Sequence, residues 1–183
     1  MVPVYLTGVL ELSPGAMGLV ASAVGFGGFF GQFGWPGLSD KFGRKPVCTI
    51  GFIGATICVF WFFQTGPSVG ALFVSLFLTA FFCLGNVALI TGPIATESAP
   101  TGLVAASIGI VVGTGEIFGG GVAPAIAGGV ANSMGLPSIV WVPVIGVALG
   151  IVVSLFLKET APVKIGAAAP QAVDAIDESG PIA

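Results

Sequence analysis

Three long stretches of this chain carry almost no charge, and their lengths limit what it can fold into. Residues 12–39 and 46–96 contain no Lys, Arg, Asp or Glu, and residues 98–157 contain a single charged residue, Glu116. Charged residues make up 7% of the chain, against about a quarter in soluble domains. A soluble domain could not cover its surface with so few charges. We therefore expect an all-α integral membrane protein, because about 20 apolar residues in a helix cross a bilayer.

Turn signals divide these stretches into five expected transmembrane helices. A Gly-Pro pair at 66–67 breaks the second stretch, and the sequence Asn-Ser-Met-Gly-Leu-Pro at 132–137 breaks the third. Residues 1–12 have the composition of the end of a further, truncated helix, and the polar residues 159–183 are expected to form a disordered tail. The helices are expected at about 15–36, 46–64, 68–93, 102–131 and 138–157.

All five cations fall on one side of this arrangement. Lys41, Arg44 and Lys45 lie between the first and second helices, and Lys158 and Lys164 follow the fifth. The connections on the other side contain no Lys or Arg. By the positive-inside rule, the 37–46 loop and the C-terminal tail are then cytoplasmic, in a multi-pass protein of the plasma membrane or of a bacterial inner membrane.

Composition argues against several classes of function. The chain has no His, which removes His-based metal sites and the catalytic arrangements that need this residue. Its net charge of −3 argues against a nucleic-acid partner. The cysteines lie in apolar stretches without metal-ligand spacing, and are expected to pack as small apolar residues: Cys48, Cys58 and Cys83. We expect no metal, no cofactor and no enzymatic activity.

The expected loop between the first two helices carries a specific pattern. Residues 35–46 read Trp-Pro-Gly-Leu-Ser-Asp-Lys-Phe-Gly-Arg-Lys-Pro. Gly43 permits a left-handed backbone, Asp40 can cap a helix or pair with Arg44, and the cations suit the lipid headgroup region. A generic basic loop would explain the cations but not the order Asp-x-x-Gly-Arg-Lys.

This order resembles the signature loop of the major facilitator superfamily, Gly-x-Leu-Ala-Asp-Arg/Lys-x-Gly-Arg-Arg/Lys. Ser39 replaces the Ala of that pattern, and Pro36 stands where its first Gly would be. The resemblance implies a secondary transporter of two six-helix halves, in which the loop makes gating contacts between the halves. Six positions match the pattern, and the last five are the candidate gating residues: Leu38, Asp40, Lys41, Gly43, Arg44 and Lys45.

Later segments resemble the C-terminal half of such a transporter. The sequence Glu-Ser-Ala-Pro at 97–100 and the glycine-rich segment 109–128 resemble the entry to the eleventh helix of the family and the helix itself. Residues 157–162, Leu-Lys-Glu-Thr-Ala-Pro, resemble the end of the twelfth helix. The resemblance covers about residues 1–162, and implies that the N-terminal half and most of the seventh helix are missing.

Glycines four residues apart are expected to let helices approach closely in the membrane. Gly27 and Gly31 form such a pair in the first helix, and the segment 109–119 contains two more pairs in the fourth. The glycines at 119–121 and Pro124 are expected to soften or kink the fourth helix.

Glu116 is the main candidate for proton coupling or substrate contact. It lies about 21 Å along the 102–131 helix, where an unsatisfied charge costs at least ~2.5 kcal/mol. It either gains and loses a proton beside a cavity or fixes helix packing by bonding to groups such as Thr114, and the sequence leaves both open. Asn86 and Gln32 are neutral candidates for a cavity wall, with interhelical hydrogen bonds as the alternative.

These features predict alternating-access transport of a small solute, coupled to protons or another ion. The runs at 36–40, 115–124 and 158–162 resemble the anion:cation symporter branch, whose members carry organic or sugar acids with protons. No Lys or Arg lies within a span, so the charge partner of an anionic substrate would belong to the missing half. The alternative is a truncated membrane fragment or scaffold that transports nothing, and an intramembrane enzyme is a third reading.

Overall fold

The computed structural model describes residues 2–166. This part of the chain consists of helices joined by short turns and loops, and it contains no strand. Its long helices are apolar enough to cross a membrane, which confirms the predicted all-α membrane fold with five spans. The spans are Pro14–Phe42, Arg44–Gln64, Val69–Glu97, Val104–Met134 and Leu136–Leu155.

Two of the spans contain a π-helical segment. The segment η1 (Ile90–Ile94) joins α4 (Val69–Leu89) to α5 (Ala95–Glu97). The segment η2 (Glu116–Val122) joins α6 (Val104–Gly115) to α7 (Ala123–Met134). A proline lies inside η1 and another lies just after η2, and a proline cannot donate the backbone hydrogen bond that an α-helix requires. The α-helices are α1 (Val2–Gly8), α2 (Pro14–Phe42), α3 (Arg44–Gln64), α4 (Val69–Leu89), α5 (Ala95–Glu97), α6 (Val104–Gly115), α7 (Ala123–Met134), α8 (Trp141–Leu155) and α9 (Pro162–Ile165), and the 3-10 helix η3 (Leu136–Val140) precedes α8.

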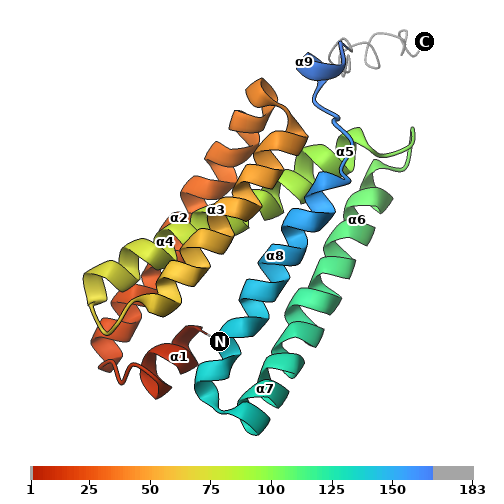
Figure 1. Ribbon diagram of the computed structural model, residues 1–183. Helices are drawn as coiled ribbons and strands as arrows, with labels where there is room; N and C mark the ends of the chain where they lie inside the picture. The colour runs from red at the N-terminus through yellow and green to blue at the C-terminus, as the bar shows by residue number, and fades with distance from the viewer. Residues whose placement is uncertain (1, 167–183) are drawn as a thin grey trace, which may run out of the picture.

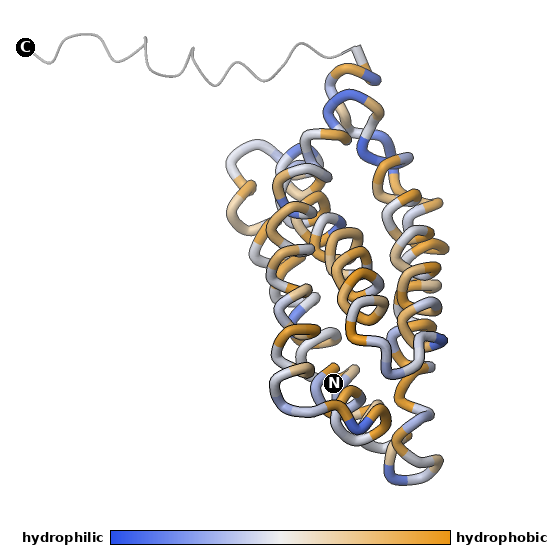
Figure 2. Tube along the Cα trace, turned by 90° about the vertical axis from the view of Figure 1, so that its left-hand side faces the viewer, coloured by the Kyte–Doolittle hydropathy of each residue, from blue (hydrophilic) through white to orange (hydrophobic). Residues whose placement is uncertain are grey.

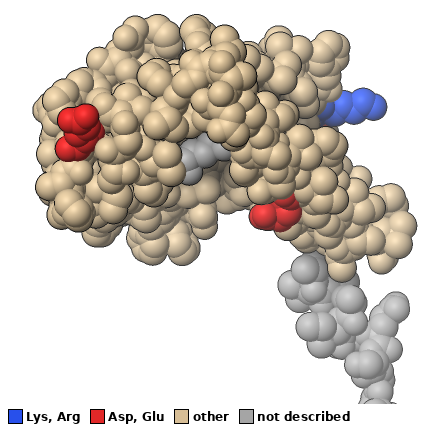
Figure 3. Space-filling view, turned by 90° about the horizontal axis from the view of Figure 1, so that it is seen from below, with Lys and Arg blue, Asp and Glu red and all other residues tan. Residues whose placement is uncertain are grey.

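The spans form two groups that lie side by side: the first holds α2, α3 and α4, and the second holds α8 and the α6–η2–α7 helix (Figure 1). Helices α2, α3 and α4 pack together, α8 packs against α3, and the long α6–η2–α7 helix lies beyond α8 (Figure 1). Apolar residues dominate the length of the helices, and hydrophilic residues gather near their ends (Figure 2). Viewed from the end formed by α1 and α7, the surface shows few charged side chains (Figure 3).

Helix α2 continues through most of the expected 37–46 loop. It begins at Pro14, where the hydroxyl of Ser13 accepts a hydrogen bond from the backbone N–H of Ala16. It ends only at Phe42, and Gly43 alone separates it from α3. The prediction that the helix ends near Pro36 is therefore wrong. Pro36 is accommodated within α2, and its carbonyl oxygen accepts a hydrogen bond from the Ser39 hydroxyl.

The expected disordered tail is ordered in its first part. Glu159 makes hydrogen bonds to α3 and Thr160 makes one to α5, and α9 follows them. The prediction is therefore wrong for 159–166, because Glu159 and Thr160 find polar partners at the ends of the spans. The remainder of the expected tail, 167–183, lies outside the described residues. The expected helix end at 1–12 contains the short helix α1.

The tightest packing lies between α2 and α4. Gly27 and Gly31 are buried, and a Cβ atom added to either would collide with the backbone of Phe77 or Phe81. This pair therefore sets the close approach that the sequence predicts. By contrast, the glycines at 109, 113, 115 and 119 have open space where a Cβ would lie.

The α6–η2–α7 helix is the least covered span. Ala127 is its one buried residue within the described part of the chain. The glycine pairs of this helix therefore pack against no other element within residues 2–166.

Candidate functional site

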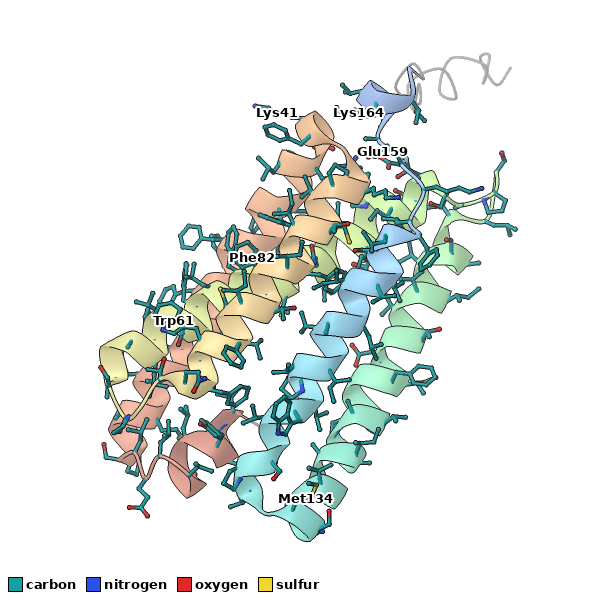
Figure 4. The ribbon with its side chains drawn as sticks, in the orientation of Figure 1. Lys41, Trp61, Phe82, Met134, Glu159 and Lys164 are labelled. Atoms are coloured by element: carbon teal, nitrogen blue, oxygen red, sulfur yellow. The ribbon has the colours of Figure 1, made fainter. Side chains whose placement is uncertain are left out.

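The cations of the signature segment lie at the end of the bundle that also holds α5 and α9. In Figure 4, Lys41, Glu159 and Lys164 lie near this end, and Met134 lies at the opposite one. The fold thus brings the end of α2, the start of α3, the end of α5 and the segment after α8 together.

Arg44 is the centre of this junction. Its side chain is 6% exposed, and one terminal nitrogen lies 2.6 Å from a carboxylate oxygen of Asp40. The other lies 2.7 Å from a carboxylate oxygen of Glu97, and the Nε–H also donates to that carboxylate. The guanidinium further donates to the hydroxyl of Ser39 and the carbonyl of Pro36. A planar guanidinium can satisfy several acceptors at once, which a lysine ammonium cannot do in the same geometry.

Glu159 caps the start of α3 from the far end of the chain. Its carboxylate accepts hydrogen bonds from the backbone N–H groups of Arg44, at 2.7 Å, and Lys45, at 3.3 Å. It also accepts from the backbone N–H groups of Thr160 and Ala161. A carboxylate at this position satisfies N–H groups that have no partner within the helix and interacts favourably with the helix dipole.

These hydrogen bonds lower the pKa of the Glu159 carboxyl. Partial burial alone would raise the pKa of its carboxyl, but the four backbone N–H donors stabilise the charged form. The net result is a pKa below the ordinary value for a glutamate.

Thr160 contacts both Glu159 and Glu97, through its backbone N–H and its hydroxyl. Its hydroxyl donates a hydrogen bond of 2.7 Å to the Glu97 carboxylate, which already binds Arg44. Glu97 at the end of α5 and the segment after α8 are thereby held to the same arginine. We refer to Asp40, Arg44, Glu97, Glu159 and Thr160 as the Arg44 junction.

The other signature residues surround this junction. Gly43 has φ +104° and ψ 151°, a backbone conformation that favours glycine but lies outside the left-handed helical region. The ammonium of Lys45 donates a hydrogen bond of 2.7 Å to the carbonyl of Leu155 at the end of α8. Lys41 lies exposed on the last turn of α2.

Asn86 joins three helices in the interior of the first group. Its side chain is 1% exposed, and its amide oxygen accepts a hydrogen bond of 2.8 Å from the indole N–H of Trp35 on α2. Its amide nitrogen donates a hydrogen bond of 3.1 Å to the carbonyl of Cys48 on α3. Both polar groups of Asn86 are engaged within the bundle. This geometry corresponds to the interhelical alternative stated for Asn86.

Glu116 lies apart from these contacts, at the start of η2. Its side chain is exposed, and it forms no ion pair within residues 2–166. It lines a cavity of about 490 Å³ between the α4–η1 and α6–η2 segments. Both π-helical segments contribute to this cavity, and π-helical turns are frequent at functional sites. Its other lining residues are Val87, Ile90, Thr91, Val111, Val112 and Gly115.

The three mid-membrane candidates do not form one site. Neither Asn86 nor Gln32 lines the cavity beside Glu116. Gln32 lies exposed on α2, and Asn86 is enclosed between Trp35 and α3.

Sequence reasoning missed Glu97, Glu159 and Thr160 as site residues. The sequence did contain a sign of the two glutamates. The chain has only eight acidic residues, and Glu97 and Glu159 each follow a span that ends on the side of the cations. Trp35 was missed as the partner of Asn86, since residues 51 apart in the sequence carry no local sign of their contact.

The profile of the Major Facilitator Superfamily matches residues 1–177 of the chain. The chain belongs to this superfamily. No curated protein and no solved structure matches it significantly. As a member of the Major Facilitator Superfamily with five apolar spans, the protein is a multi-pass membrane protein of a transporter family. The resemblance of its signature segment to that of the superfamily therefore identified the family correctly.

Proposed function

We propose that this chain forms the second helix bundle of an alternating-access symporter that carries a small organic or sugar acid together with protons. The observation that carries the proposal is the position of Glu116. It is the single charged residue among residues 98–157, and it lines the cavity between two π-helical segments. A carboxylate at this depth is expensive unless it faces water, a partner or a ligand.

A second bundle would cover the exposed face of the chain. The α6–η2–α7 helix has one buried residue in the described structure, and its glycines present an open surface. Small residues of this kind allow another helix to approach closely in lipid. The proposal assigns the N-terminal bundle to this face, and with it the cation that pairs with an anionic substrate, because the spans of this chain hold none in their interiors.

The test is uptake of labelled sugar acids by the complete gene product, reconstituted in vesicles with an imposed pH gradient. Glu116→Gln keeps the shape of the side chain but cannot bind and release a proton. It should abolish pH-driven uptake and leave substrate exchange across the membrane intact. The matched control is Glu11→Gln, at the opposite end of the bundle from the Arg44 junction, which should leave both activities unchanged.

Two outcomes would count against the proposal. Unchanged pH-driven uptake in Glu116→Gln would remove the coupling role and favour a structural role for this carboxylate. Absence of uptake for every organic and sugar acid tested, by a protein that is folded and inserted, would favour the non-transporting scaffold.

We further propose that the Arg44 junction acts in conformational switching and not in substrate binding. It joins the ends of several helices, and Arg44 can hold Asp40 and Glu97 together in only some arrangements of those helices. Asp40→Asn in the complete transporter should slow transport and change equilibrium substrate binding by no more than a few-fold. Loss of binding in a folded Asp40→Asn protein would contradict the switching role.

A further inference from the structure

An apolar groove lies between the end of α2 and the start of α3. It has a volume of about 310 Å³, and none of its lining residues is charged. Trp35 and Val47 are almost fully buried and form its floor, and more exposed side chains form its walls. The complete lining is Trp35, Leu38, Phe42, Pro46, Val47 and Ile50.

Lys41 is the cation next to this lining on α2. It directly precedes the lining residue Phe42 on the last turn of α2, and Figure 4 shows it at the outer edge of the α2–α3 turn. The neighbouring cations are already engaged, Arg44 by two carboxylates and Lys45 by the carbonyl of Leu155. Within residues 2–166, Lys41 forms no ion pair.

Within the described residues, Lys41 is therefore the cation of this segment that remains available for an anionic ligand. Asp40 is the adjacent acid, and its carboxylate is paired with the Arg44 guanidinium at 2.6 Å. Lys41 and Trp35 are six residues apart, about 9 Å along the helix axis. A cation at the membrane surface thus lies just beyond an apolar groove that extends toward the membrane interior.

We propose that this groove binds an anionic phospholipid, with one acyl chain in the groove and the phosphate against the Lys41 ammonium. An acyl chain matches the uncharged lining, and a negatively charged headgroup complements a surface cation. A zwitterionic phospholipid fits the groove equally well but has no net charge for Lys41 to attract. The proposal therefore predicts a preference among headgroups for the same acyl chains.

The bound lipid would contact both helices on either side of Gly43. Leu38 and Phe42 belong to α2, and Val47 and Ile50 belong to α3. A lipid in this position would steady the turn that carries the signature residues. The inference does not depend on the identity of the transported solute or on the role of Glu116.

The test uses Trp35 as a reporter in the floor of the groove. The chain has three tryptophans, so Trp61→Phe and Trp141→Phe leave Trp35 as the fluorophore. The full chain is reconstituted in vesicles that contain increasing fractions of phosphatidylglycerol or phosphatidylcholine with identical brominated acyl chains. Bromine quenches tryptophan at short range, so quenching of Trp35 reports occupancy of the groove.

Half-maximal quenching of Trp35 should occur at a several-fold lower fraction of brominated phosphatidylglycerol than of brominated phosphatidylcholine. Lys41→Gln should remove this preference, and Lys41→Arg should keep it. Lys164→Gln, which removes a cation at the same end of the bundle but away from the groove, should also keep it. Lys41 is exposed, so these variants are expected to fold, and an unchanged Trp35 emission maximum in unbrominated vesicles verifies this.

Two results would overturn the proposal. Equal quenching by the two brominated lipids would show that the groove does not select an anionic headgroup. A preference for phosphatidylglycerol that survives Lys41→Gln would place the selecting charge elsewhere.

Discussion

The indole N–H of Trp35 donates a hydrogen bond to the amide oxygen of Asn86, 51 residues further along the chain. Because the Asn86 amide nitrogen also donates to the Cys48 carbonyl, one side chain joins α2, α3 and α4. The glycine contacts fit the same picture, since a Cβ on Gly85 would press against Trp35 and one on Gly51 against Asn86. These three helices therefore form a unit fixed by shape and by directional bonds.

The first prediction concerns this bond. Asn86→Ala should lower the free energy of unfolding by about 1 kcal/mol, the scale of interhelical hydrogen bonds in membranes. Trp35→Phe in the Asn86→Ala background should cost less than it does in the wild type. Unfolding in a denaturing detergent, monitored by circular dichroism, measures the four proteins of this double-mutant cycle. Additive effects would show that the bond contributes nothing to stability.

The second prediction concerns Glu159 and pH. Its pKa in the folded protein is lowered, so the folded state holds the charged form more readily than the unfolded chain does. The resulting stabilisation is fully present above the ordinary glutamate pKa of about 4.3 and is lost as the pH falls through the lowered value. Glu159→Gln should therefore lower the thermal midpoint clearly at pH 7 and less at pH 3.

The control for this prediction is Glu11→Gln, because Glu11 is exposed at the opposite end of the bundle. Its thermal midpoint should follow that of the wild type at both pH values. Equal destabilisation by Glu159→Gln at pH 7 and pH 3 would show that charge on Glu159 does not stabilise the α3 terminus.

The third prediction compares two glycines. A methyl group at Gly31 would collide with the backbone of Phe81, and backbone cannot move aside as a side chain can. Gly31→Ala should therefore push α2 and α4 apart and destabilise the protein by about 1–3 kcal/mol, as overpacking does. Gly113→Ala meets open space and should leave the stability of this chain unchanged. Thermal unfolding of the two purified variants decides between these outcomes.

The fourth prediction concerns orientation in the membrane. Single cysteines are introduced at Lys41 and Ser133 in a background without Cys48, Cys58 and Cys83. An impermeant maleimide applied to intact cells should label position 133, and position 41 only after the membrane is opened. This follows from the location of the cations at one end of the bundle and the positive-inside rule. Labelling of both positions from outside would contradict the five-span arrangement.

The spans were predictable because each crossing of the bilayer requires a long run of apolar residues, and such runs can be recognised in the sequence itself. A stretch of about 20 residues without charge leaves few alternatives to a transmembrane helix. The end of α2 was not predictable in the same way. Pro36 and Gly37 are typical of a turn, yet α2 continues for six residues beyond Pro36.

The partners of the functional candidates depend on three-dimensional packing, which local sequence does not encode. Asp40 and Arg44 are four residues apart across Gly43, and their pairing was one of the two alternatives stated for Asp40 from the sequence. Glu97 and Glu159 reach Arg44 from 53 and 115 residues away. Glu116 was identified by its isolation in the sequence, but its position between two π-helical segments became visible only in the folded chain.

Gly43 has a mechanical consequence. It is the one residue between a helix of 29 residues and a helix of 21, and the longer arm extends about 43 Å. Asn86 bonds the same two helices to each other further inside the membrane, so α2 and α3 are held together both at Gly43 and at Asn86. A displacement of the Arg44 junction would therefore move α2, α3 and α4 together as one rigid body, and not α2 alone.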